Sequence, residues 1–220
     1  FVEDGRKTGI GSSAALMVAL AAAINASTDV AELAMAAHLR LQGGRDSGVD
    51  ISTAVSGGLV EYTRSELRAR PLHWPDGLVY RVIWTGVPAS TERQLEKLGA
   101  AAVGASRSAL LLVAPRMRDA WRSGDADAVL AEYVPYIGVL RQFSIDHDLG
   151  IFDAGHDELT DAAMVDGLVY KPAGAGGGDI GMLFGRSDAE LDAFLQSNAG
   201  LINGVLDCAL DSTGVRLEAA

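Results

Sequence analysis

The most informative segment of the chain is Lys7-Thr8-Gly9-Ile10-Gly11-Ser12-Ser13-Ala14-Ala15-Leu16. Glycines precede two hydroxyl residues, and an apolar stretch that predicts a helix follows directly. The backbone N–H groups of such a loop and helix N-terminus have no intrahelical partners, and the helix dipole adds partial positive charge. A phosphate is therefore a natural ligand here. The alternative is a serine N-cap on a buried helix, with glycines forming a tight turn.

If a phosphate binds at this segment, Ser12 and Ser13 stand where one hydroxyl could bond a phosphate oxygen and the other could coordinate Mg²⁺. The segment is not a P-loop, because no lysine follows its last glycine.

A second glycine cluster, Gln42-Gly43-Gly44-Arg45-Asp46-Ser47-Gly48-Val49-Asp50, precedes a stretch of small and apolar residues that ends at Gly58. Asp50 is expected to be partly buried there, where an unpaired carboxylate is costly. It could accept a proton from a substrate hydroxyl or orient a cation beside it. Alternatively, it could cap a helix over Ile51 to Val55.

The third cluster is Lys171-Pro172-Ala173-Gly174-Ala175-Gly176-Gly177-Gly178-Asp179. Its glycines let the main chain approach a ligand more closely than any side chain would allow. The alternative is a floppy surface turn. Lys171 could neutralise phosphate charge or simply be solvated.

Composition excludes several classes of protein. The 220 residues are 49% hydrophobic and carry a net charge of −11, so the chain is not intrinsically disordered and nucleic acid is not an expected partner. The longest apolar run, Ala14 to Ile24, is too short to span a bilayer and predicts a helix buried on all sides. We therefore expect no membrane partner. The lone Cys208 favours a reducing, cytoplasmic setting and is interpreted as a packing residue.

Irregular alternation of helices and strands predicts an α+β fold with two lobes, divided near Pro71 to Pro75 into residues 1–75 and 76–220. Asp29 and Glu32 are spaced as a capping box, and Pro135 is expected to kink or end its helix. The abrupt start suggests the later part of a longer chain. The expected helices run from Ser12 to Asn25, Val30 to Leu41, Glu92 to Leu98, Ala105 to Arg122, Asp125 to Phe143 and Ala189 to Gln196, and the strands from Leu59 to Tyr62, Leu78 to Trp84, Leu168 to Lys171 and Ile180 to Phe184.

The three glycine clusters, in this order, resemble the motifs of the GHMP kinases, a family of ATP-dependent small-molecule kinases. The resemblance covers most of the chain. It implies an N-terminal lobe like the second domain of ribosomal protein S5, which we expect to be truncated here, and a ferredoxin-like C-terminal lobe. The likeness is greatest to the members that phosphorylate phosphomevalonate, through Lys7-Thr8, through Trp84-Thr85-Gly86-Val87-Pro88-Ala89-Ser90-Thr91, and through Lys171-Pro172 with Asp179.

The resemblance also implies a set of site residues. Asp50 and Ser13 match catalytic positions, and Ser13 is also the expected Mg²⁺ ligand. The substrate-binding candidates are Lys7, Arg45, Ser47, Gly48 and Lys171. The expected ATP-binding residues are Gly9, Ile10, Gly11, Ser12, Ser13, Ala14, Gly174, Ala175, Gly176 and Gly177.

The implied reaction transfers the γ-phosphoryl group of ATP to phosphomevalonate to give mevalonate diphosphate. An acceptor phosphate is largely ionised at neutral pH, so Asp50 would position groups or metal rather than act as an obligatory base. The alternatives are a mevalonate or sugar kinase of the same family, or a non-catalytic relative that senses a nucleotide or metabolite. The sequence gives no signal for the oligomeric state.

Overall fold

The computed structural model describes residues 2–3, 6–24, 29–41, 47–98 and 104–216 of the chain. Internal contacts divide the chain into two compact units. The larger comprises Phe1–Ile10 and Pro75–Cys208, and the smaller comprises Gly11–Trp74 and Ala209–Ala220. The units are therefore not two consecutive segments, because each takes in one end of the chain.

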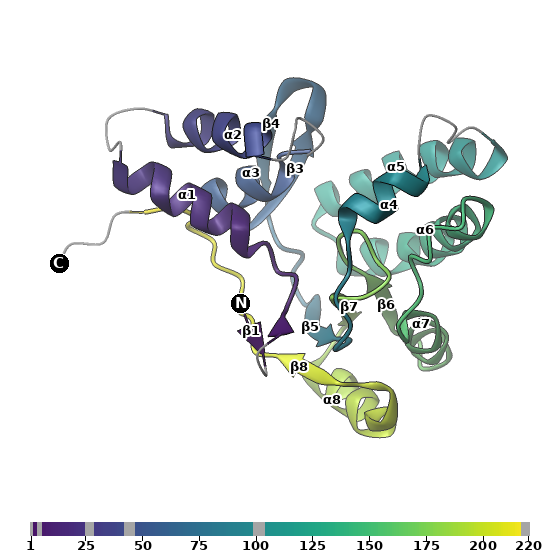
Figure 1. Cartoon of the computed structure of the whole chain (residues 1–220). Helices are drawn as coiled ribbons and strands as arrows, with labels where there is room; N and C mark the ends of the chain where they lie inside the picture. Colours follow the sequence, from purple (N-terminus) through teal and green to yellow (C-terminus); the bar gives the residue numbers. More distant parts are fainter. Residues whose placement is uncertain (1, 4–5, 25–28, 42–46, 99–103, 217–220) are drawn as a thin grey trace. The chain divides into compact units, whose positions relative to one another are not determined.

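Helices and strands are mixed along the chain in runs of unequal length (Figure 1). The elements are β1 (Val2–Glu3), β2 (Arg6–Lys7), α1 (Ser12–Ile24), α2 (Val30–Leu41), α3 (Val49–Ser56), β3 (Leu59–Thr63), η1 (Arg64–Glu66), β4 (Arg68–Leu72), β5 (Val79–Trp84), α4 (Thr91–Leu98), α5 (Ala105–Ser123), α6 (Ala126–Asp146), α7 (His156–Val165), β6 (Val169–Pro172), β7 (Ile180–Gly185), α8 (Asp188–Ser197), η2 (Ala199–Leu201) and β8 (Gly204–Leu206).

A sheet in the order β6-β7-β5-β8 forms the centre of the larger unit. All of its neighbouring strands are antiparallel. Helices connect β5 to β6 and β7 to β8, whereas β6 and β7 form a hairpin. This split β-α-β arrangement is ferredoxin-like, as expected for the C-terminal lobe.

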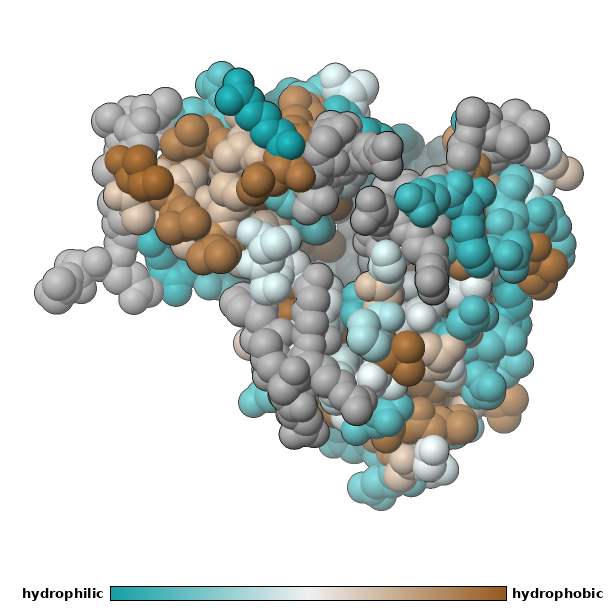
Figure 2. All heavy atoms as spheres, in the orientation of Figure 1, coloured by the Kyte–Doolittle hydropathy of each residue, from teal (hydrophilic) through white to brown (hydrophobic). Residues whose placement is uncertain are grey.

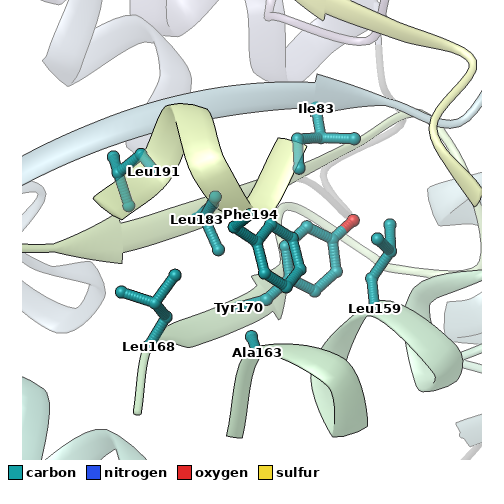
Figure 3. Packing of buried hydrophobic residues seen from close by; sticks show 8 residues of the cluster. All are labelled: Ile83, Leu159, Ala163, Leu168, Tyr170, Leu183, Leu191 and Phe194. Carbon is teal, nitrogen blue, oxygen red and sulfur yellow. The ribbon is translucent and has the colours of Figure 1, made fainter. Parts of the chain in front are cut away.

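The two faces of the sheet carry different helices. Tyr170 and Leu183 are directly opposite each other in β6 and β7, and both point into a buried cluster with residues of α7 and α8 (Figure 3). Phe184, the next residue of β7, points to the other face because side chains alternate along a strand. Its ring contacts Trp121 of α5 and Tyr133 of α6.

The prediction allowed Pro135 either to kink or to end its helix. Pro135 does not end the helix. Helix α6 runs through Pro135 from Ala126 to Asp146. A proline inside a helix removes one hydrogen bond. Buried residues lie on both sides of it, Tyr133 and Ile137, and Tyr133 stacks on Phe184 of β7, so this packing offsets that loss.

The smaller unit consists of α1, α2 and α3 with the antiparallel hairpin β3–β4. Ala14 and Val18 of α1, Met35 of α2 and Ile51 of α3 belong to one buried cluster. The segment after Cys208 joins this unit: the backbone N–H of Gly58 donates to the carbonyl of Asp211 at 2.6 Å.

Helix α1 is not buried on all sides, which corrects the expectation from its composition. Leu16, Leu20 and Ile24 are exposed, with Ile24 at 80%. These residues are four apart and form one stripe, and Figure 2 shows apolar surface over α1 and α2. The small residues of the opposite side pack against α2 and α3. No helix among the described residues has the length and apolar character needed to cross a bilayer.

Most of the expected elements are present within one to three residues of their predicted ends. At α2 the Asp29 side chain accepts from the backbone N–H groups of Ala31 and Glu32, as the capping pattern predicts. Asn25, the expected end of α1, lies outside the described residues. The sequence did not predict β1, β2, β4, α7 or β8, and Pro71 lies within β4, where it pairs with Val60.

Candidate active site

The glycine-rich loop between β6 and β7 is packed against its own unit. Gly177 N–H donates to the Ile151 carbonyl at 2.8 Å. A Cβ at Gly176 would lie 2.6 Å from that carbonyl oxygen, and one at Gly178 would lie 2.5 Å from the carbonyl oxygen of Val87. The interpretation as a floppy surface turn is therefore wrong. A Cβ at Gly174 would meet nothing within 4 Å, so the main chain faces open space there.

A buried histidine holds the end of this loop. His156, the first residue of α7, lies with Nε2 3.0 Å from the Gly178 carbonyl oxygen and with Nδ1 2.8 Å from the Tyr170 hydroxyl. Because a carbonyl only accepts, Nε2 carries the proton and donates to Gly178, and in the neutral ring Nδ1 accepts from Tyr170. Desolvation lowers the pKa of His156, which favours this neutral form.

Lys171 is a desolvated cation at the start of the same loop. It lies in β6 opposite Met182 of β7 and is half-buried. Burial lowers the pKa of its ammonium to about 8. Within the part of the chain that the structure describes, no carboxylate pairs with it. A partly buried cation without a counter-ion is unfavourable in the free protein, and an anionic ligand relieves this cost.

The first glycine segment meets the glycine-rich loop inside the larger unit. Gly9 has φ +77°, and a Cβ added to it would collide with the carboxyl group of Asp179, which directly follows Gly178. Gly9 and Asp179 both belong to the larger unit. Two segments 170 residues apart in the sequence are therefore neighbours.

The remainder of the first glycine segment opens α1 in the smaller unit. The Gly11 carbonyl accepts from Ala15 N–H at 3.1 Å, as expected for the residue before the helix. A Cβ at Gly11 would meet nothing within 4 Å, and Ser13 is exposed. The first-turn N–H groups thus lie at an open helix end, the geometry that suits a phosphate.

Asp50 lies in the first turn of α3, one residue inside the helix. It is exposed, not partly buried as expected. It is also not the cap, because Gly48 occupies the N-cap position. Tyr62 donates its hydroxyl hydrogen to the Ser47 carbonyl at 2.7 Å and thereby fixes the turn before the helix. Ala14 and Ile51, which directly follow Ser13 and Asp50, share one buried cluster, so the starts of α1 and α3 belong to one packed region.

Two predicted substrate-binding residues have no described side chain. Arg45 lies outside the described residues, and Lys7 is described only as backbone of β2. The division between the units falls within the first glycine segment, after Ile10. Gly9, Ile10, Gly174, Ala175, Gly176, Gly177 and Lys171 belong to the larger unit, and Gly11, Ser12, Ser13, Ala14, Ser47, Gly48 and Asp50 to the smaller. The roles of these residues remain predictions.

Sequence reasoning missed the residues that support the glycine loops. His156 and Tyr170 hold the third cluster, and Tyr62 holds the second. The histidines show no ligand spacing, and the tyrosines stand in ordinary strand patterns. No signal in one sequence identifies side chains that act on a loop distant along the chain.

Comparisons with known proteins agree with the fold. No family model matches the sequence. The chain is 33% identical to a phosphomevalonate kinase from a Streptomyces species over 86% of its own length, and it spans 60% of that relative. Among solved structures, a protein from Listeria innocua aligns with a TM-score of 0.84 at 23% identity, covering 94% of this chain and 68% of the other. A Streptococcus pneumoniae phosphomevalonate kinase in complex with phosphomevalonate and AMPPNP aligns with a TM-score of 0.75 at 19% identity, covering 93% and 70%.

The ferredoxin-like sheet and these likenesses show the fold of the GHMP kinases, and the chain is similar in sequence to a kinase of that class over most of its length. The relative that is 33% identical to this chain is a phosphomevalonate kinase. The resemblance read from the three glycine clusters is thus confirmed, as is the α+β fold.

Proposed function

We propose that this chain carries the phosphoryl-transfer site of an ATP-dependent kinase that converts phosphomevalonate into mevalonate diphosphate. The observation that carries the proposal is the meeting of Gly9 with Asp179, because it joins the two glycine segments expected to bind the same nucleotide. The likeness to a phosphomevalonate kinase supports the choice of acceptor.

In this proposal the nucleotide phosphates receive hydrogen bonds from backbone N–H groups of residues 9–13, and Lys171 compensates phosphate charge. A phosphate oxygen of phosphomevalonate attacks the γ-phosphorus of ATP, the bond to the β-phosphate oxygen breaks, and ADP leaves with that electron pair. Such a reaction depends chiefly on alignment and charge neutralisation. Each preorganised donor contributes about 3 to 4 kcal/mol of transition-state stabilisation.

The Asp50 carboxylate fits the donors that Mg²⁺ uses in kinases, one or two carboxylates together with substrate phosphates, and a serine hydroxyl such as that of Ser13 is a further oxygen donor used in nucleotide-binding sites. Both are exposed and lie in first helical turns of the smaller unit. Mg²⁺ would supply charge neutralisation on the transferred phosphate. Asp50 would position the metal ion and not remove a proton, because the acceptor phosphate is already ionised and needs no base.

A coupled ADP-release assay with phosphomevalonate, mevalonate, mevalonate diphosphate and galactose tests the proposal. We expect ADP release with phosphomevalonate in preference to the others, and no CO₂ with mevalonate diphosphate. Preferred release with mevalonate or galactose would assign a different acceptor. Binding of ATP without release of ADP for any acceptor would contradict the kinase proposal and favour a sensor.

A further inference from the structure

Asp179 adopts an unusual backbone conformation for a residue with a side chain. Its φ is +54°, in the left-handed region, directly after the Gly174–Gly178 loop. Glycine adopts this region freely, and the loop uses glycine at several neighbouring positions with positive φ. A glycine at position 179 would satisfy the backbone equally well. The carboxylate must therefore supply something that glycine cannot.

The polar groups of Asp179 bind the turn that follows β5. Its N–H donates to the Val87 carbonyl at 2.7 Å, and its carbonyl accepts from the N–H and hydroxyl of Thr85 at 2.9 and 3.1 Å. Its Oδ1 accepts from Ala89 N–H at 3.1 Å. The side chain thus adds a charge-assisted hydrogen bond to a pair of backbone attachments. The turn itself is closed by Val87 N–H, which donates to the Thr85 hydroxyl at 3.2 Å.

The other side of the carboxyl group lies against Gly9. Any side chain at position 9 would collide with Asp179, and the left-handed φ of Gly9 further favours glycine. One side chain therefore contacts the turn Thr85–Ala89 by a hydrogen bond and the first glycine segment by packing. It is itself part of the chain that leaves the glycine-rich loop.

From these contacts we infer that Asp179 is a positioning residue that sets the spacing between the two glycine segments. This inference rests on the proposed function. It also gives a role to the turn within Trp84-Thr85-Gly86-Val87-Pro88-Ala89-Ser90-Thr91, which the site described above does not use. The Asp179 carboxylate is hydrogen-bonded to this turn and packs against Gly9, and it thereby keeps the two glycine segments at a set distance from each other. Nucleotide affinity then depends on this side chain even though it does not bind the nucleotide.

Three single variants separate the side chain from the backbone conformation. Asp179→Gly removes the carboxylate and keeps the left-handed backbone, whereas Asp179→Asn keeps both the size and an oxygen that can accept from Ala89. The matched control is Asp148→Gly, because Asp148 is also an aspartate with positive φ in the larger unit, but its exposed carboxylate pairs with Lys97. The readouts are AMPPNP affinity by calorimetry, the KM for ATP, kcat and the melting temperature.

We expect Asp179→Gly to weaken AMPPNP binding and raise the KM for ATP by roughly ten-fold, with a smaller effect on kcat. Asp179→Asn should restore most of the affinity, and Asp148→Gly should bind as the wild type does. An Asp179→Gly variant that binds AMPPNP with wild-type affinity would overturn the positioning role. A loss of affinity matched in Asp148→Gly would overturn it as well, since the effect would then be general.

A double-mutant cycle with Gly9→Ala tests the contact itself. In the wild type, Gly9→Ala creates the collision with the carboxyl group; in the Asp179→Gly background that collision is absent. We expect the loss of AMPPNP affinity from Gly9→Ala to be roughly five-fold smaller in that background. Equal losses in both backgrounds would contradict the inference. If the wild type binds no AMPPNP, the proposed function fails and the inference fails with it; if it binds and the cycle shows no coupling, only the inference fails.

Discussion

Replacement of Lys171 by methionine should move folding stability and ligand affinity in opposite directions. Burial lowers the pKa of the ammonium from 10.5 to about 8. At about 1.4 kcal/mol per pKa unit, the protonated form is disfavoured by roughly 3 kcal/mol in the free protein. Because the residue is only half-buried, solvent screening reduces this, and we expect Lys171→Met to raise the free energy of unfolding by about 1 to 2 kcal/mol at pH 7.

The pH dependence of this gain has a definite sign. Below pH 8 the lysine is protonated in both states, so the wild type carries the full penalty. Between about pH 8 and 10.5 the unfolded chain holds the proton and the folded chain does not, so wild-type stability rises with pH. The stability difference between the variant and the wild type should therefore be largest at pH 7 and vanish near pH 10.5.

The same change should weaken binding of phosphorylated ligands. Loss of a charge-assisted contact costs about 1.5 to 3 kcal/mol, so affinity for AMPPNP or phosphomevalonate should fall by at least about ten-fold. Calorimetry measures each ligand separately, and denaturant unfolding at pH 7 and pH 10 measures stability. Lys97→Met is the control, because Lys97 is exposed and pairs with Asp148, so it should change stability by less than about 1 kcal/mol. A Lys171→Met variant that is less stable than the wild type and binds both ligands normally would refute the reasoning.

Three further predictions follow from the described contacts. Asp50→Asn and Ser13→Ala should each lower kcat by roughly 100-fold or more with little change in melting temperature, since both side chains are exposed; wild-type turnover in both would remove the site assignment. Gly178→Ala should destabilise the fold by about 2 kcal/mol or more in urea unfolding, because its Cβ would meet the Val87 carbonyl oxygen; a stability within error of the wild type would show that the loop yields. Burial lowers the pKa of His156, so the unfolded state binds more protons, and the free energy of unfolding should fall as pH drops below about 6.5. If a His156→Gln variant loses the same amount of stability at low pH, another group causes the loss.

Local patterns predicted most of the secondary structure. The spacing of Asp29 and Glu32 marked the start of α2 because N-capping depends on residues within one turn. Pro135 misled because the cost of a proline in a helix is local, whereas the packing that offsets it comes from the sheet. The exposed stripe of α1 could not be predicted from composition, since every residue from Ala14 to Ile24 is apolar and no polar residue marks the outer face.

The candidate site was only partly predictable, for a similar reason. The glycine clusters are visible because each is continuous in the sequence. The contacts that shape them join distant residues: Gly9 with Asp179, His156 with Gly178, and Tyr62 with Ser47. Spacing along one chain does not encode which residues meet after folding, so the desolvated state of Lys171 also needed the structure.

The most direct test of the account is a titration of glycine-labelled protein with AMPPNP, followed by the amide resonances of the glycines in the two segments. We predict that Gly9 and Gly11 shift together with Gly174 and Gly176, with one common Kd. Shifts confined to one of the two segments, or different affinities for each, would contradict the claim that both bind the same nucleotide.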